Sequence, residues 1–332
     1  MAPSIRDRRS LIVETEPQLC ESARPRLSFD DHQWRDPCTP WAGRGCLHDP
    51  MTSSSSQPIT GTAAGVPFTA LPPPEDRAHA PLVVIWHLLD PPRTDSAMAA
   101  ALPMAALPAW RLYLGLPMTG RRLPAGGSEE MMRLGLADPV LNLLGPILSQ
   151  AADEAPAAVA AVRTQLGISD GPIGVAGGSL GGGVAMEVIA AGALPVSVAA
   201  LVNPFVRMPS AVAAIERVFD VHYEWTDASR AVADRFDFVR RSAEIATAEP
   251  ALLLVSGADD PPEFRADAEA LEGELASRYR DRSRVRLHRE PGMPHHLAEP
   301  PGVEPAPQTA HAAAVDAAFT SWFTEHLTSP AH

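Results

Sequence analysis

Residues 173–184 read IGVAGGSLGGGV, and this stretch decides the expected fold. The apolar run at 173–177 predicts a buried strand, and the glycines that follow Ser179 open a predicted helix. Gly177, Ser179 and Gly181 match the GxSxG pattern, in which a serine lies on a sharp turn between strand and helix. Such a strained turn needs neighbours without side chains, which these glycines supply. We therefore expect Ser179 to be a nucleophile at the start of a helix.

A dinucleotide-binding turn is the competing interpretation of the same stretch. Ala176, Gly177, Gly181 and Gly183 resemble the TGxxxGxG turn of short-chain dehydrogenases, but that turn belongs near the start of a domain, and several predicted strands precede it here. All 27 Lys and Arg residues of this chain are Arg, so the Tyr/Lys pair of those enzymes has no lysine. The nucleophile turn is therefore favoured over the dinucleotide turn.

Composition narrows the function classes further. The chain has 332 residues, 45% hydrophobic, with a formal net charge of −13. This charge repels phosphate backbones and anionic membranes, so we expect neither nucleic acid nor membrane as a partner. The absence of Lys excludes a Schiff base to pyridoxal phosphate and a P-loop lysine. The most apolar stretch, 184–202, is interrupted by Glu187 and Pro195, and it predicts a buried helix and a strand rather than a membrane span.

Apolar runs alternate with helical patterns from residue 59 onward, which predicts a mostly parallel sheet covered by helices on both faces. A hairpin is expected at 59–71 and a surface-facing last strand around Val285 and Leu287. A helix is expected at 155–166, and a closing helix should align Val315, Phe319, Trp322 and Phe323. The remaining strands are expected at 82–86, 110–116, 173–177, 198–202 and 252–255.

Residues 1–50 differ from the rest of the chain. They hold all three cysteines and no sustained periodicity, so we expect a disordered or spurious N-terminal extension, with translation starting at Met51. Neither an export signal nor a zinc site is expected there, because the apolar run after Arg9 is too short and no CxxC pair occurs. Without cysteine beyond Cys46, the folded part needs no oxidising compartment, and a cytoplasmic protein is expected.

From about residue 59 to 327 the chain resembles the α/β-hydrolase fold family of esterases, lipases, thioesterases and prolyl-oligopeptidase-like serine hydrolases. The resemblance implies one such domain at 51–332, with a helical lid insertion at about 204–250. Within that insertion the sequence has helical patterns at 211–219 and 229–246. It also implies an acid in the loop after the strand at 252–255 and a histidine after the next strand. The family's spacing selects Asp260 and His295, with Asp259 and His296 as their competitors. The order Ser179, Asp260, His295 is the order that this family uses.

The oxyanion hole is expected from two backbone N–H groups. Leu180 follows the nucleophile at the helix N-terminus, where the backbone dipoles favour negative charge. The family usually has His-Gly in its oxyanion loop, whereas here His87 is followed by Leu88, Leu89 and Asp90. By position Leu89 is the expected second donor, with Leu88 as the fallback.

Two segments are candidates for the pocket wall. Aromatic residues of the lid either line an apolar acyl pocket or pack the lid onto the core: Phe219, Tyr223, Trp225, Phe236 and Phe238. The segment 118–150 offers further apolar residues for the same wall or for a surface helix: Met131, Met132, Leu134 and Leu136.

These features predict a serine hydrolase that cleaves a small or medium carboxylic ester through a covalent acyl-enzyme. The expected partner is a small-molecule acyl substrate, and no metal or organic cofactor is expected. A thioesterase, a peptidase and an acyltransferase share the same triad and stay open, because fold does not fix function. A catalytically silent, hydrolase-like binding protein is the alternative from another class. Oligomeric state is not predicted.

Overall fold

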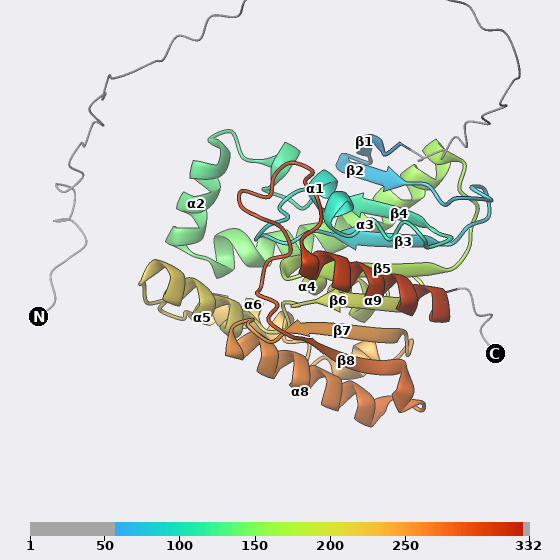
Figure 1. Cartoon of the computed structure of the whole chain (residues 1–332). Coiled ribbons are helices and arrows are strands. Elements are labelled where there is room, and N and C mark those ends of the chain that lie inside the picture. The colour runs from blue at the N-terminus through green and yellow to red at the C-terminus, as the bar shows by residue number, and fades with distance from the viewer. Residues whose placement is uncertain (1–56, 328–332) are drawn as a thin grey trace, which may run out of the picture. The chain divides into compact units, whose positions relative to one another are not determined.

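The computed structural model describes residues 57–327, which fall within one compact unit. An eight-stranded sheet in the order β1-β2-β4-β3-β5-β6-β7-β8 forms its centre (Figure 1). All neighbours from β4 to β8 are parallel, and the β1-β2 and β2-β4 pairs are antiparallel. The predicted α/β architecture is thereby confirmed. The predictions for residues 1–50 lie outside the described residues.

The strands are β1 (Ile59–Ala63), β2 (Val66–Leu71), β3 (Leu82–Trp86), β4 (Trp110–Leu114), β5 (Ile173–Gly178), β6 (Val196–Val202), β7 (Ala251–Gly257) and β8 (Val285–Glu290). The α-helices are α1 (Asp95–Ala101), α2 (Gly127–Ala137), α3 (Gly145–Leu166), α4 (Leu180–Ala190), α5 (Met208–Phe219), α6 (Asp227–Arg235), α7 (Ser242–Ile245), α8 (Pro262–Arg278) and α9 (Ala310–His326). No helix of the described part is long and apolar enough to cross a bilayer.

Two helical layers explain why the central strands are apolar at every position. In β3, Leu82, Val84 and Trp86 join the core under α3, α4 and α8, whereas Val83 and Ile85 join the core under α1 and α9. Successive side chains of a strand point to opposite faces, so a strand covered on both sides has no position left for a polar residue. Figure 1 shows α9 crossing one face of the sheet.

The ends of the sheet also follow the predicted patterns. The hairpin is formed by β1 and β2, and β8 lies at the opposite edge with an alternating burial pattern. In α9 the four residues predicted to share a face are all buried: Val315, Phe319, Trp322 and Phe323.

Two helix predictions needed correction. The helix expected at 155–166 begins ten residues earlier, as α3, and includes Pro156. The helical pattern expected at 229–246 is broken between α6 and α7. The reason is that Phe236 and Phe238 are both fully buried, and residues two apart lie on opposite sides of a helix. The boundaries of the expected lid stay a prediction, with α5, α6 and α7 occupying this part of the chain.

The first turn of α4 approaches the end of β3 backbone to backbone. A Cβ atom at Gly181 would overlap the carbonyl oxygens of Trp86 and His87, and one at Gly177 would overlap the carbonyl of Gly181. No side chain separates these segments, so nothing flexible is available to make room. The absence of a side chain at Gly181 therefore allows the first turn of α4 to touch the end of β3, and its absence at Gly177 allows the tight turn between β5 and α4.

We expect Gly181→Ala to lower the free energy of unfolding by about 3 kcal/mol or more, because the new Cβ atom overlaps the carbonyl groups of Trp86 and His87, and backbone atoms cannot move aside locally. Gly273→Ala in α8 is the matched control, since a Cβ atom there meets nothing within 4 Å. This control should stabilise the protein by up to about 1 kcal/mol through helix propensity alone. Urea unfolding of both variants measures the contrast, and equal stability of the two would contradict the packing described above.

Candidate active site

Ser179 is held in a strained backbone conformation between β5 and α4. Its φ of +46° and ψ of −122° lie in a region that residues with a side chain rarely adopt. Its N–H donates to the carbonyl of Val202 at 3.0 Å, and its own carbonyl accepts the N–H of Phe205 at 2.9 Å. These bonds to β6 and the segment after it hold the turn in place.

The structure brings together the three side chains that the sequence singled out. His295 Nε2 lies 2.8 Å from Ser179 Oγ, and His295 Nδ1 lies 2.6 Å from Asp260 Oδ1. Asp260 follows β7 and is buried, whereas its competitor Asp259 is exposed. His296 takes no part in this chain of contacts.

The surroundings of His295 favour its charged form. Burial alone lowers the pKa of His295, but the hydrogen bond with Asp260 and the negative charges of Asp260 and Asp90 outweigh it, so the pKa is raised above its usual value. The second oxygen of Asp260 is buried without a hydrogen-bond partner among the described residues, which leaves the imidazole as the partner of that carboxylate. The ring of Phe264 covers the imidazole at 4.9 Å between centroids.

Asp90 is a second carboxylate beside the imidazole, and sequence reasoning did not single it out. Its Oδ2 lies 3.8 Å from His295 Nε2, and its side chain is 53% exposed. The signal available in the sequence was its position, directly after the two leucines of the expected oxyanion loop.

Asn203 is a further residue that sequence reasoning missed. Its Nδ2 donates to the carbonyls of Pro294 at 2.9 Å and His295 at 3.1 Å, and its Oδ1 accepts the N–H of Gly257 at 2.7 Å. One buried amide thus joins the end of β7, which carries the acid, to the loop that carries the histidine. Its signal was an isolated Asn directly after a buried strand.

The two expected oxyanion donors lie beside the nucleophile. Leu89, Leu180, Ser179 and His295 line one cavity. Neither the Leu180 N–H nor the Leu89 N–H has a hydrogen-bond partner within residues 57–327. Leu88, the fallback donor, has a fully buried side chain that lies over Gly178.

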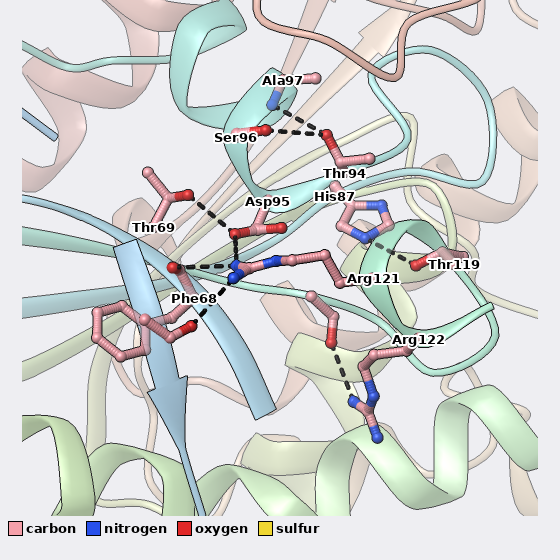
Figure 2. A network of polar contacts seen from close by, with 12 residues as sticks. Phe68, Thr69, His87, Thr94, Asp95, Ser96, Ala97, Thr119, Arg121 and Arg122 are labelled. Atoms are coloured by element: carbon pink, nitrogen blue, oxygen red, sulfur yellow. Dashed lines mark hydrogen bonds and ion pairs between the residues drawn. The ribbon is translucent and has the colours of Figure 1, made fainter. Parts of the chain in front are cut away.

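His87 fixes the orientation of the Leu88–Leu89 peptide group. His87 Nδ1 lies 2.6 Å from the Leu88 carbonyl, which can only accept, and His87 Nε2 accepts the N–H of Leu116 at 3.1 Å. The imidazole is therefore neutral with its proton on Nδ1, and Thr119 lies against Nε2 (Figure 2). In a trans peptide the N–H points away from the carbonyl, so this contact turns the Leu89 N–H away from His87.

The cavity beside Ser179 is apolar and has a volume of about 210 Å³. Its walls come from the start of α3, α5 and the start of α8, through Leu144, Ala211, Ala214, Ile215, Val218 and Phe264, together with Phe205. None of the five lid aromatics lines this cavity. Phe236 and Phe238 are fully buried core residues, so the packing interpretation holds for them. Met131 lines a different cavity, and Met132 and Leu136 are exposed.

Known proteins resemble this chain in structure but not in sequence. No family model and no curated protein matches the sequence. Est1E from Butyrivibrio proteoclasticus matches with a TM-score of 0.53 and 14% identity, over 81% of this chain and 98% of that one. The acylaminoacyl peptidase of Pyrococcus horikoshii matches with a TM-score of 0.59 and 12% identity, over 83% of this chain and 42% of that one. TT1662 from Thermus thermophilus matches with a TM-score of 0.53 and 17% identity, over 82% and 99% of the two chains.

The chain has the α/β-hydrolase fold. The order of the strands agrees with the family resemblance that the sequence indicated. So does the position of Ser179, directly after the carboxyl end of β5. Among residues 57–327, no group of three or more His, Cys, Asp or Glu side chains is arranged to hold a metal ion.

The charge of Asp90 gives a prediction for the pH profile. A neutral imidazole is required to accept a proton, so kcat/KM of an ester substrate should fall as the pH drops through the pKa of His295. Because the negative charge of Asp90 raises that pKa, Asp90→Asn should move the acidic limb to lower pH. High salt should move the wild-type limb in the same direction by screening the half-exposed carboxylate. Glu272→Gln on α8 is the control and should leave the acidic limb where it is in the wild type. If the acidic limb of Asp90→Asn also stays in place, the contact between Asp90 and His295 is contradicted.

Burial of His87 gives a prediction for stability. Burial lowers its pKa from 6.5 to about 4, despite opposing contributions from the Leu88 carbonyl and Asp95. The unfolded chain therefore binds a proton at pH values where the folded protein does not, and stability falls as the pH drops from about 6.5 towards 4. Between pH 7 and pH 4.5 this residue should cost roughly 2 kcal/mol.

Urea unfolding of the wild type and His87→Gln at the two pH values measures that cost. The variant should lose less stability on acidification than the wild type, since glutamine does not titrate. His222→Gln, at a largely exposed position, should behave as the wild type does. Identical pH dependence in all three proteins would show that His87 is not buried in its neutral form.

Proposed function

We propose that this protein is a serine hydrolase that cleaves a small or medium carboxylic ester through a covalent acyl-enzyme. The observation that carries the proposal is the hydrogen-bonded chain from Ser179 Oγ through His295 to Asp260. This arrangement supplies what a serine hydroxyl lacks by itself, a base within reach and a carboxylate that steadies the resulting imidazolium.

The proposed reaction begins with attack of Ser179 Oγ on the ester carbonyl while its proton passes to His295 Nε2. Asp260 holds Nδ1–H and stabilises the imidazolium. The developing oxyanion accepts hydrogen bonds from the N–H groups of Leu180 and Leu89, which have no other hydrogen-bond partner in the described part of the chain. His295 then protonates the departing alcohol oxygen. Water next attacks the carbonyl of the acyl-enzyme, with His295 again accepting a proton, and the carboxylic acid leaves as His295 returns the proton to Ser179 Oγ.

The expected size of the acyl group follows from the apolar cavity. A volume of about 210 Å³ next to Ser179 fits a short or medium acyl chain, and apart from Asp90 and the two catalytic candidates Ser179 and His295 its lining side chains are apolar. Fold neighbours named as peptidases share the scaffold, but an apolar wall next to the nucleophile suits an aliphatic acyl group. The lack of cysteine after Cys46 supports a cytoplasmic location.

Ser179→Ala should lower turnover of p-nitrophenyl butyrate by roughly 10⁴-fold or more and abolish labelling by a fluorophosphonate. Peptide mapping of the wild type should place the label on Ser179. Ser277→Ala, an exposed serine of α8, is the control and should retain both properties. A p-nitrophenyl series should show falling kcat/KM for long acyl chains. Unlabelled wild type would instead favour a hydrolase-like binding protein.

A further inference from the structure

A second and larger cavity lies on the other side of Leu89. It has a volume of about 590 Å³, and Leu89 is the residue that it shares with the apolar cavity beside Ser179. Its size is within the range of small-molecule sites. Most of its surface is apolar, with Leu89, Leu123, Met131 and Val303 in the lining. Its polar residues include Thr69, Arg93, Asp95, Arg121, Ser128 and Glu304.

The larger cavity adjoins the candidate site through Leu89 and through two chain segments. In the proposed reaction His295 Nε2 protonates the leaving group, and Asp90, which lines the small cavity, lies 3.8 Å from that atom. The segment that begins at Asp90 continues through residues 93–96 into the wall of the larger cavity. Val303 and Glu304, which belong to the loop after His295, also line this cavity.

These two segments are fixed to one another by hydrogen bonds. The Arg93 N–H donates to the Gly302 carbonyl at 2.7 Å, and Thr94 Oγ1 donates to the Val303 carbonyl at 2.8 Å. Closer to the histidine, the Leu297 N–H donates to the Pro91 carbonyl at 2.9 Å. Part of the cavity wall thus comes from the same two loops that carry the expected oxyanion donor and the imidazole.

A buried carboxylate lies at the centre of the polar lining (Figure 2). Asp95 Oδ2 accepts from Thr69 Oγ1 at 2.9 Å and from Arg121 Nη2 at 2.8 Å, and the Asp95 side chain is only 7% exposed. Its other oxygen, Oδ1, has no hydrogen-bond partner among the described residues, yet it is not sealed from solvent. The cavity therefore contains a fixed, unused acceptor whose position is set by two neighbours.

The charges around the cavity balance. Arg121 is paired with Asp95, and at the rim Arg93 and Glu304 are both exposed, without an ion-pair partner within residues 57–327. A cavity with one free cation, one free carboxylate and several hydroxyl groups offers both donors and acceptors but no net charge. A ligand whose every polar group both donates and accepts matches this lining, and alcohol hydroxyls have that property.

We propose that the larger cavity binds the alcohol portion of the ester substrate, and that this alcohol is a neutral polyhydroxylated group such as a sugar or another polyol. This inference rests on the proposed serine hydrolase function. The substrate is then an aliphatic acyl ester of a polyol: the apolar cavity takes the acyl chain, Ser179 receives the acyl group, and the polyol leaves with the proton from His295.

Three butyrate esters with the same acyl group test the proposal: a methyl glucoside ester, a cyclohexyl ester and an ester of a hydroxy acid. The glucoside ester should have a kcat/KM at least about tenfold above that of the cyclohexyl ester, because the latter leaves buried polar groups unpaired. Equal values, or preference for the cyclohexyl or the anionic ester, would overturn the assignment of a neutral polyol.

Ser128→Trp fills the cavity from its exposed rim at the start of α2, away from the triad. It should lower kcat/KM for the glucoside ester by about tenfold or more while p-nitrophenyl acetate turnover changes less than about twofold. Ser277→Trp, at an exposed serine of α8 that lines neither cavity, is the matched control and should leave both values unchanged. An equal loss for both substrates in the tryptophan variant, or no loss for the glucoside ester, would place the alcohol elsewhere.

A binding experiment separates this inference from the proposed function. Saturation-transfer NMR with methyl glucoside on Ser179→Ala should detect binding, and the double variant Ser179→Ala/Ser128→Trp should lose it. Turnover of p-nitrophenyl butyrate without glucoside binding or preference would overturn the polyol site alone. Glucoside binding in a protein that neither hydrolyses esters nor reacts with fluorophosphonate would support the cavity while removing the hydrolase assignment.

Discussion

The close approach of α4 to β3 is the constraint on which the candidate site depends. At Gly181 the two backbones touch without an intervening side chain, and the missing side chain of Gly177 in β5 leaves room for the carbonyl of Gly181 itself. The strained conformation of Ser179 costs on the order of 1–3 kcal/mol and persists only because its surroundings determine it. Its hydrogen bonds to Val202 and Phe205 supply that support from β6 and the segment after it.

Two buried polar side chains then position the loops around the elbow. Asn203 joins the end of the strand that precedes Asp260 to the histidine loop, and His87 holds the Leu88–Leu89 peptide group through the Leu88 carbonyl. Both side chains act on backbone atoms and are almost completely buried. A buried polar group that is fully hydrogen-bonded fixes one arrangement, because every alternative leaves it unpaired.

Leu88 and Leu89 follow His87, where the family usually has a glycine, and Leu89 lies between two cavities. Leu88 packs over Gly178, and Leu89 separates a small apolar cavity, which Ser179 lines, from a larger cavity with a mixed polar and apolar lining. Under the proposed function the two unlike halves of an ester would lie on either side of Leu89. Helix α5 and the start of α8 contribute to the small cavity, and the segment after β3 and the loop after His295 contribute to the larger one.

The sequence by itself determined the sheet and the elbow with Ser179, because apolar runs and glycine spacing encode them locally. The family resemblance selected Asp260 and His295, with Asp259 and His296 as their competitors. The residues alone did not rank Asp259 against Asp260, since neighbours on a loop differ only in which one the fold buries. Asn203, Asp90 and the Asp95 network were not visible, because each acts on partners far along the chain. The lid aromatics were likewise undecided: burial of Phe236 and Phe238 depends on how the insertion packs. Only the tertiary structure decides such questions, because distance between side chains is a property of the folded chain and not of spacing along it.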